Sequence, residues 1–566
     1  MVALVRWSRS RALAADARMS GDLDKATVLC RRALAGNPGN ARALLELGNI
    51  QRRQGQLKEA VATYEQAVAN GAEGPEVHYN LGALFEVRNR LDQAQTSYQR
   101  ALELHPGFPG AELGLVHVAQ QLCQWDGLDE RVTRLQRLVG QPIYPALSPF
   151  SFLSLPGVGP ADQRRWAEHW VEDRYGALAL SRPDWKSHSR TPGDGRIRLG
   201  YLSADYHDHA TAYLIAELIE LHDNARFQVN AYSYGPNDDG AMRRRLGAAF
   251  DRFLDVRSMS FMEAARRIND DGIDILVDLK GYTQNTRSDI LALRPAPIQV
   301  NFLGYPGTMG ADFIDYLVTD EFIVPPDAAR DYSEAPAYLP HCYQPNDRQR
   351  SIGARPTRRD CGLPDRGMVF CSMNRTYKIT PEIFDLWCRL LRAVPGSVLW
   401  LHKSNRWADV NLAEAAGRRG IGGARLVFAE KLPLAQHLGR LQLADLFLDT
   451  LPYNAHTTAS DALWCGVPVV TCAGNTFAGR VAGSLLTAIE LPELIAHDLD
   501  GYYRLALRLA SNPAELAAVK ARLAQNRLTT PLFDTPRYTR DLEALFTEMH
   551  RRRLAGKPNG PIRLKQ

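Results

Sequence analysis

His456, Thr457 and Thr458 stand where an apolar run gives way to a helical pattern. The run, Leu443 to Leu448, has the length of a buried parallel strand. Free backbone N–H groups and the positive end of the helix dipole converge at such a helix start, and threonine hydroxyls add further donors. The arrangement is therefore suited to hold a diphosphate without a metal. Asp461, one turn further along, can accept hydrogen bonds from sugar hydroxyls.

Three further candidates, Lys378, His437 and Arg440, follow predicted strands in the same part of the chain. Lys378 lies between a predicted strand and a helix that starts at Thr380-Pro381, with proline at its first position. A solvated lysine is the simpler interpretation, but a departing diphosphate requires a cation at such a place. His437 and Arg440 are spaced i, i+3 and so share one face of a helix. A threonine at a helix start can also be a simple cap, but two threonines and a histidine exceed what a cap needs.

A second group of candidates precedes these in the chain. His209 follows the first predicted strand and stands just before a helix, which favours it over His207, although either can be a surface histidine. Gly304, Pro306 and Gly307 form a tight turn after another strand, with N–H groups that can face a ligand. Both groups are therefore expected at the carboxyl ends of strands.

Short apolar strands alternate with helical patterns from Ile197 onward, which predicts parallel sheets with helices on both faces. Ligands of such sheets bind at the carboxyl ends of the strands. The pattern divides into two doubly wound halves with a cleft between them. Phe546 and Met549, in the last helical segment, are expected to return that helix across the cleft. The predicted strands include IRLGYLS (197–203), FQVNAYSYG (227–235), IDILVDLKGY (273–282), IQVNFLG (298–304), IDYLVTD (314–320), MVFCSMN (368–374), SVLWLHK (397–403), RLVFAEK (425–431), DLFLDT (445–450) and PVVTCAG (468–474).

Residues 20–108 repeat with a period of 34 residues. Small and large positions of two antiparallel helices recur together, as in a tetratricopeptide array. Residues 110–138 keep the helical spacing and are predicted to form a capping repeat. Stacked helix pairs present a groove for extended peptide, so protein binding is favoured over a purely structural or dimerising array. The matched positions are Ala26, Ala60 and Ala94; Cys30, Tyr64 and Tyr98; Ala33, Ala67 and Ala101; and Gly48 and Gly82.

The composition is that of a soluble globular protein, with 45% hydrophobic and 23% charged residues. A net charge of +5 on 566 residues argues against nucleic acid as the main partner. The N-terminal apolar stretch is broken at Arg6 and too short for a signal sequence, so a cytoplasmic location is expected. The eight cysteines form no CxxC pair, and no Asp-x-Asp lies at a strand end, so no metal site is predicted.

Taken in order, these segments resemble the O-linked N-acetylglucosamine transferases, inverting enzymes that join tetratricopeptide repeats to a two-domain GT-B catalytic unit. The resemblance extends over about residues 20–550 and is that of a bacterial member. Its most specific stretches are GYLSADYHDHAT (200–211), ALRPAPIQVNFLGYPGT (292–308), NRTYKI (374–379), QLADLFLDTLPYNAHTTASDALWCGVPVVT (442–471) and RVAGSLL (480–486).

The resemblance implies a division of the chain into five parts. These are a tetratricopeptide array with its capping repeat (1–139), a helical linker (140–196), an N-terminal Rossmann-like half on the acceptor side (197–345), a connector (346–362) and a C-terminal Rossmann-like half on the nucleotide side with a terminal helix (363–566). The implied fold class is thus an α-helical repeat array followed by an α/β GT-B fold.

The resemblance also implies roles for individual residues. Lys378 would contact the diphosphate, His437 would stack near the uracil and Asp461 would take the ribose. The implied donor site comprises Arg375, Tyr377, Lys378, His437, Arg440, His456, Thr457, Thr458 and Asp461. The implied residues near the donor sugar and acceptor are His209, Gly304, Pro306, Gly307 and Thr308.

The chain also departs from the animal members of the family. Arg375 stands where they have a glutamine beside the diphosphate, and Leu434 replaces a lysine near the nucleotide. Asn80 keeps the inner-face asparagine of the repeats, while Glu46 and Gly114 occupy the equivalent positions. The long insert between the catalytic halves is absent.

The expected reaction moves GlcNAc from UDP-GlcNAc to a Ser or Thr hydroxyl of a protein, with inversion and with no metal or other cofactor. His209 and Lys378 are the expected catalytic residues. The proton acceptor is either His209 or a phosphate oxygen of the donor. Two other hypotheses remain open: the same fold using GDP-fucose or UDP-glucose, and a repeat scaffold with an inactive transferase domain. A homo-oligomer is also possible.

Overall fold

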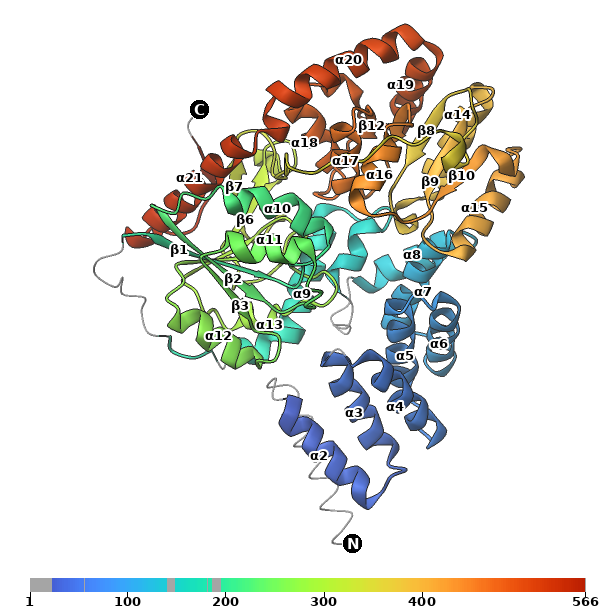
Figure 1. Cartoon of the computed structure of the whole chain (residues 1–566). Coiled ribbons are helices and arrows are strands. Elements are labelled where there is room, and N and C mark those ends of the chain that lie inside the picture. The colour runs from blue at the N-terminus through green and yellow to red at the C-terminus, as the bar shows by residue number, and fades with distance from the viewer. Residues whose placement is uncertain (1–22, 55, 140–147, 181, 186–194, 565–566) are drawn as a thin grey trace. The chain divides into compact units, whose positions relative to one another are not determined.

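The computed structural model describes residues 23–54, 56–139, 148–180, 182–185 and 195–564, which form two compact units. One unit holds the helices α2–α8, and the other holds two parallel β-sheets with their helices (Figure 1). Both parts of the predicted fold class are therefore confirmed. The predicted N-terminal stretch and the linker residues 186–194 lie outside the described residues.

The repeat unit consists of antiparallel helix pairs whose equivalent helices begin 34 residues apart, at Ala41, Pro75 and Pro109. Gly82 lets Tyr98 lie flat against its helix, because a Cβ there would be 2.6 Å from the ring. The large and small positions of the repeat therefore interlock as the sequence predicts. The helices are α2 (Leu23–Gly36), α3 (Ala41–Arg53), α4 (Leu57–Ala69), α5 (Pro75–Val87), α6 (Leu91–Leu104), α7 (Pro109–Leu122) and α8 (Leu128–Val139).

The first sheet has eight parallel strands in the order β14-β7-β6-β5-β4-β1-β2-β3. Its central strands β4, β5 and β6 are fully buried because helices cover both faces of the sheet. The strands are β1 (Ile197–Ser203), β2 (Phe227–Ser233), β3 (Arg252–Asp255), β4 (Ile275–Asp278), β5 (Ile298–Asn301), β6 (Tyr316–Asp320), β7 (Ala335–Leu339) and β14 (Ile562–Arg563). Its helical segments are η1 (Pro149–Ser154), α9 (Pro160–Leu180), α10 (Ala210–Glu220), α11 (Ala241–Ala249), α12 (Phe261–Asp270), α13 (Asp289–Ala292) and η2 (Pro326–Asp331).

The second sheet has six parallel strands in the order β10-β9-β8-β11-β12-β13. The strands are β8 (Val369–Ser372), β9 (Val398–His402), β10 (Leu426–Ala429), β11 (Leu446–Leu448), β12 (Val469–Cys472) and β13 (Ile495–Ala496). The longer helices are α14 (Pro381–Ala393), α15 (Arg406–Arg418), α16 (Leu434–Leu441), α17 (Thr457–Trp464), α18 (Val481–Ala488), α19 (Leu499–Ser511), α20 (Pro513–Thr529) and α21 (Thr535–Leu554). The short 3₁₀ turns are η3 (Arg359–Cys361), η4 (Thr376–Lys378), η5 (Gly423–Arg425), η6 (Pro492–Leu494) and η7 (Pro531–Phe533).

Several predicted strands are shorter than expected, and the run 443–448 shows why. The apolar run 443–448 forms a strand only at its end, β11, because the N–H groups of Leu443 and Ala444 bond back to carbonyls of Arg440 and Leu441 at the end of α16. Its first residues are therefore a turn rather than a strand.

The end of the chain returns to the first sheet. Helix α21 packs against α10 and β7 (Figure 1). Its Phe546 and Met549 are fully buried. Strand β14 then pairs with β7 and adds an edge to the same sheet. The sequence order groups this segment with the second half, whereas α21 and β14 contact helices and strands of the first.

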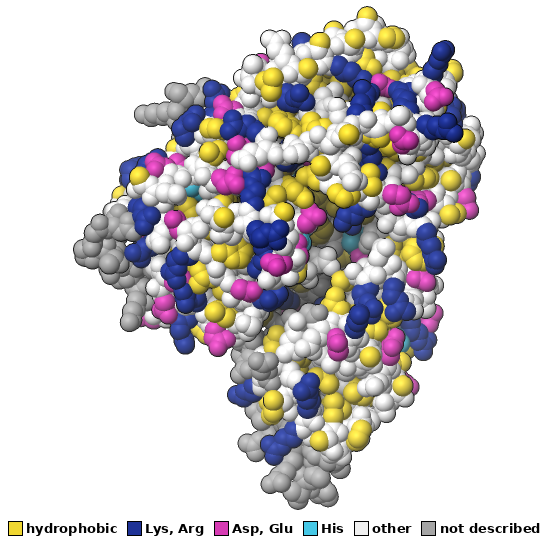
Figure 2. Space-filling view, in the orientation of Figure 1, with side chains coloured by type: hydrophobic (Ala, Val, Ile, Leu, Met, Phe, Trp, Pro, Cys, Tyr) yellow, Lys and Arg dark blue, Asp and Glu magenta, His cyan; other side chains and the backbone are white. Residues whose placement is uncertain are grey.

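Positive and negative side chains alternate over the face of the molecule shown in Figure 2. No helix of the described residues is long and apolar enough to cross a membrane. Nor do the described residues bring together three or more His, Cys, Asp or Glu side chains in a way that could hold a metal ion.

Candidate functional site

The loop between β11 and α17 is fixed by a buried carboxylate at the strand end. Asp449 Oδ1 accepts hydrogen bonds from the N–H groups of Thr450 (2.7 Å) and Ala455 (2.6 Å), and its Oδ2 accepts one from the Thr471 hydroxyl (2.6 Å). The Asn454 side chain donates to the Thr450 carbonyl at 2.8 Å. Burial raises the pKa of Asp449. These bonds set where helix α17 begins.

The first turn of α17 has backbone N–H groups that make no hydrogen bond within the described part of the chain. Its first intrahelical bonds run from the N–H groups of Ala459 and Ser460 to the His456 carbonyl. Within the described part of the chain, the N–H groups of His456, Thr457 and Thr458 donate to no other residue. Three consecutive unpaired N–H groups at the positive end of a helix form a site for an anion.

Lys378 lies beside this helix start. It ends the 3₁₀ turn η4, and its Nζ donates a hydrogen bond of 2.8 Å to the Asn454 carbonyl and lies 3.8 Å from the centre of the Tyr453 ring. The side chain is buried and forms no ion pair with any described carboxylate. Burial lowers the pKa of Lys378, and the nearby Asp449 carboxylate offsets only part of this effect. A buried cation without a counter-ion is poised to receive an anion.

His456 is held in one tautomer. Its Nε2 lies 3.1 Å from the Ala478 carbonyl, so this nitrogen carries the proton and donates. Burial holds the pKa of His456 well below its usual range, and the charge of Lys378 lowers this pKa further. The imidazole is therefore neutral.

The two threonines of the helix start differ in their surroundings. The Thr458 hydroxyl donates to Asn374 Oδ1 at 2.6 Å, and Asn374 in turn donates to the Thr450 hydroxyl at 2.9 Å. The Thr457 hydroxyl makes no hydrogen bond to the described residues. Thr457 is therefore the freer of the two to reach a ligand.

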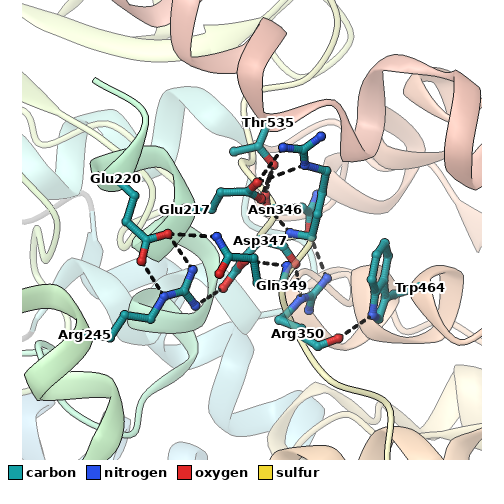
Figure 3. Close-up of polar contacts among 10 residues, drawn as sticks. Glu217, Glu220, Arg245, Asn346, Asp347, Gln349, Arg350, Trp464 and Thr535 are labelled. Carbon is teal, nitrogen blue, oxygen red and sulfur yellow. Dashed lines mark hydrogen bonds and ion pairs between the residues drawn. The ribbon is translucent and has the colours of Figure 1, made fainter. Parts of the chain in front are cut away.

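Asp461 is part of a buried ion pair with the connector. Its Oδ1 lies 2.5 Å from Arg350 Nη1 (Figure 3 shows the surroundings of Arg350), and both side chains are buried. Burial raises the pKa of Asp461, while Arg350 lowers it. Asp461 Oδ2 accepts no hydrogen bond from the described residues.

His437 and Arg440 contact each other on α16, as their spacing predicts. The Arg440 guanidinium donates to His437 Nδ1 at 3.2 and 3.3 Å and lies 5.9 Å from the centre of the Trp400 ring. Burial, with help from Arg440, lowers the pKa of His437 to about 4. The result is a neutral aromatic face, which is suited to stacking on a flat base.

Arg375 and Tyr377 both precede Lys378 in the chain; Arg375 is exposed, and Tyr377 is partly buried. The charge of Arg375 lowers the pKa of both Lys378 in the second half and His209 in the first. The Tyr377 ring contacts the Tyr453 ring, with centroids 6.1 Å apart. Arg375 therefore acts electrostatically on candidate residues of both halves.

His209 caps helix α10 through its side chain. Its Nδ1 accepts a hydrogen bond of 3.2 Å from the Thr211 N–H and lies 3.5 Å from Asp205 Oδ2. Burial lowers the pKa of His209, with Asp205 opposing and Lys280 adding to the effect. Because Nδ1 accepts in the cap, the neutral ring carries its proton on Nε2, which makes this outer nitrogen a donor.

A buried polar cluster of Asp205, Asp278 and Lys280 lies beside His209 and was not predicted from the sequence. Lys280 Nζ lies 3.0 Å from Asp205 Oδ1, and both side chains are buried at the ends of neighbouring strands. Asp278 accepts from the N–H groups of Lys280 and Gly281, and burial raises its pKa to about 6. The signal was present in the sequence, because all of these residues follow β1 or β4 at the carboxyl edge of the sheet.

The glycine turn after β5 is packed tightly against β4. A Cβ at Gly304 would lie 2.0 Å from the Leu279 carbonyl oxygen, so only glycine fits there. Pro306, Gly307 and Thr308 are buried, and the Thr308 hydroxyl donates to Glu334 at 2.7 Å. The Thr308 side chain is thus engaged in the interior.

The structure brings Lys378, His456, Thr457 and Thr458 together and adds Asp449, Asn374 and Arg350, which the sequence analysis did not single out. Asp449 stands at a strand end, which was a usable signal, whereas the partner of Arg350 lies 111 residues away. The ligand-binding roles assigned to the site residues stay predictions.

Comparisons with known proteins agree with this architecture. Residues 122–354 and 348–542 match glycosyl transferase family 41, and residues 17–84 and 75–108 match tetratricopeptide repeats. A mutant of the Thermobaculum terrenum O-GlcNAc transferase has a similar structure, with a TM-score of 0.69 and 30% identity, over 97% of this chain and 98% of that one.

Two curated relatives are similar in sequence. The probable UDP-N-acetylglucosamine–peptide N-acetylglucosaminyltransferase SEC of Arabidopsis thaliana is 36% identical over 452 residues, 77% of this chain and 46% of that protein. The UDP-N-acetylglucosamine–peptide N-acetylglucosaminyltransferase of Caenorhabditis elegans is 28% identical over 567 residues, 78% of this chain and 49% of that protein. The chain thus spans about half the length of these relatives.

Proposed function

Because the chain belongs to glycosyl transferase family 41, we propose that it transfers N-acetylglucosamine from UDP-N-acetylglucosamine to Ser or Thr hydroxyls of proteins, with inversion and without a metal. The names of the Arabidopsis and Caenorhabditis relatives, which specify UDP-N-acetylglucosamine and a peptide, support this donor and this class of acceptor. The tetratricopeptide unit supports a protein acceptor, since such arrays commonly bind extended peptide.

The observation that carries the proposal is the buried Lys378 ammonium beside the unpaired N–H groups of α17. As the acceptor hydroxyl attacks the anomeric carbon and the bond to the diphosphate breaks, negative charge grows on the β-phosphate. Lys378 and the N–H groups of His456, Thr457 and Thr458 are already oriented to stabilise that charge. A preorganised lysine and helix start supply the electrostatic role that a divalent cation fills elsewhere.

The proton of the acceptor hydroxyl must leave in the same step. Because His209 Nδ1 accepts from the Thr211 N–H, its neutral ring carries the proton on Nε2 and offers a donor there rather than a base. This arrangement favours a donor phosphate oxygen as the proton acceptor. His209 then contributes a hydrogen bond from Nε2 to the sugar or the acceptor.

Transfer of label tests the proposal. The protein is incubated with radiolabelled UDP-N-acetylglucosamine and a mixed protein acceptor pool in EDTA, and label in protein and released UDP are both followed. We expect label in protein, and a loss of about 10²-fold or more in Lys378→Ala, since one stabilising group of this kind contributes several kcal/mol.

Lys520→Ala is the matched control, because Lys520 of α20 pairs with Asp445 and lies outside the site. It should transfer at the wild-type rate. Absence of both labelled protein and released UDP with every acceptor pool would contradict the proposal, and so would full activity of Lys378→Ala.

A further inference from the structure

The connector residues 346–350 contact helices from both sheets of the catalytic unit. On one side, Arg348 pairs with Glu217 of α10 at 2.6 Å. Asp347 pairs with Arg245 of α11 at 2.5 Å (Figure 3). On the other side, Arg350 pairs with Asp461 of α17. Helix α10 begins next to His209 and α17 begins next to His456, so this segment links the two helices whose starts carry candidate site residues.

Arg350 is held in one position by several contacts. Its side chain is 1% exposed. The Nε donates to the Asp347 carbonyl at 3.1 Å, Nη2 lies 3.4 Å from Asn346 Oδ1, and the guanidinium lies 5.7 Å from the centre of the Trp464 ring. Asn346 itself donates to the Leu532 carbonyl at 3.1 Å. A planar guanidinium serves these partners at once, which an ammonium cannot do.

This fixed guanidinium engages one oxygen of Asp461 and leaves the other free. Oδ1 takes the 2.5 Å bond from Arg350, while Oδ2 accepts nothing from the described residues although the residue is only 5% exposed. A carboxylate oxygen that receives no hydrogen bond from the protein keeps its full capacity to accept one from a ligand. It lies one turn beyond the unpaired N–H groups of Thr457 and Thr458, where a nucleoside diphosphate would place its sugar.

We propose that Arg350 is a positioning residue of the donor site, which orients Asp461 so that Oδ2 accepts hydrogen bonds from the ribose hydroxyls of a nucleoside diphosphate. The inference rests on the proposed function for the placement of the nucleotide. Arg350 itself does not touch the ligand. Its effect passes through the ion pair.

The charges around Asp461 give this role a pH signature. Arg350 of the connector faces Asp461, and so does Cys465, which directly follows α17. Arg527 of α20 acts on Cys465 and donates a hydrogen bond to the Trp464 carbonyl. Burial raises the pKa of Asp461 and Arg350 opposes that rise. Without Arg350 the carboxyl group takes up a proton at a higher pH and has less capacity to accept the ribose hydroxyls.

Calorimetric titration with UDP and with 2′,3′-dideoxy-UDP tests the inference. Arg350→Met should weaken UDP binding roughly tenfold or more. It should leave binding of the dideoxy analogue at the wild-type level, because the lost interaction involves the ribose hydroxyls. The loss for UDP should shrink as the pH rises and Asp461 ionises again.

Arg348→Met is the matched control, since it removes an arginine of the same segment whose partner is Glu217. It should bind UDP as the wild type does. Arg350→Lys keeps the charge and should recover part of the affinity, and it replaces Arg350→Met as the test variant if the latter does not fold.

Equal losses for UDP and the dideoxy analogue would overturn the inference, as would wild-type UDP affinity in Arg350→Met. A loss of UDP affinity that does not change with pH would also count against it. If the wild-type protein binds neither UDP nor its analogue, the proposed function fails, and the inference fails with it. These outcomes are distinguishable in the same set of titrations.

Discussion

Lys378 differs from a solvated surface lysine in each property that the structure describes. Its Nζ is buried against the Tyr453 ring and has a single hydrogen bond, to the Asn454 carbonyl. Desolvation therefore disfavours the charged form until an anion arrives. A diphosphate bound at the start of α17 would restore the charge, so binding of the nucleotide and protonation of Lys378 should be linked.

We predict that UDP binding takes up a proton at alkaline pH. Burial lowers the pKa of Lys378 in the free protein, and a bound diphosphate would raise it again. In the interval between these two pKa values, affinity for UDP should fall as the pH rises, by up to about tenfold per pH unit. His456 and His437 have lowered pKa values and stay neutral throughout this interval.

Titrations between pH 7 and 10 in buffers of different ionisation enthalpy measure this proton uptake. Lys378→Met should bind UDP more weakly and with little dependence on pH. A wild-type affinity that stays constant across the interval would show that Lys378 does not change its charge on binding.

At the residue scale, the sequence predicted the side chains that follow strands but not the partners that hold them. His456, Thr457, Thr458 and Lys378 were found because strand ends and helix starts leave a local pattern. The contact between Lys378 and Asn454 joins residues 76 positions apart. No local pattern encodes such a contact, since it depends on how the strands are ordered in the sheet.

At the scale of elements, the predictions succeeded where the periodic signal was strong. Strand β1 has the predicted bounds, and the repeat helices begin at the predicted spacing. Strands β3, β7, β13 and β14 were missed. β13 and β14 have two residues each, and β3 is an edge strand without a fully buried residue, so none of these three shows the run of apolar residues that marks a central strand.

Close contact between the glycine and tyrosine positions of the repeats leads to a second prediction. In Gly82→Ala the new methyl group would meet the Tyr98 ring, which is buried and whose hydroxyl donates to Glu86 at 2.9 Å. Overpacking of this kind costs about 1–3 kcal/mol. Hydrogen exchange measured by mass spectrometry should therefore show faster exchange in α5 and α6.

Gly176→Ala in α9 is the control for this substitution. A Cβ there meets no atom within 4 Å, so the change should stabilise its helix by up to about 1 kcal/mol. UDP affinity should be unchanged in Gly82→Ala, because the repeats form a separate compact unit. Unaltered exchange in α5 and α6 of Gly82→Ala would show that the ring moves aside without cost.

At the scale of the whole molecule, the chain combines a repeat unit with two parallel sheets, as the sequence predicts. The path of the last segment could be predicted only in part. The burial of Phe546 and Met549 agrees with the expected return of α21, but the pairing of β14 with β7 joins residues more than 200 positions apart. The predicted domain boundaries stay predictions.

The central claim is that the start of α17 and Lys378 hold a uridine diphosphate without a metal. Calorimetric titration of the wild-type protein with UDP and with GDP, both in EDTA, tests this claim most directly. We predict that UDP binds in EDTA and that GDP binds at least tenfold more weakly. GDP binding as tight as that of UDP, or UDP binding that appears only when a divalent cation is added, would contradict the account.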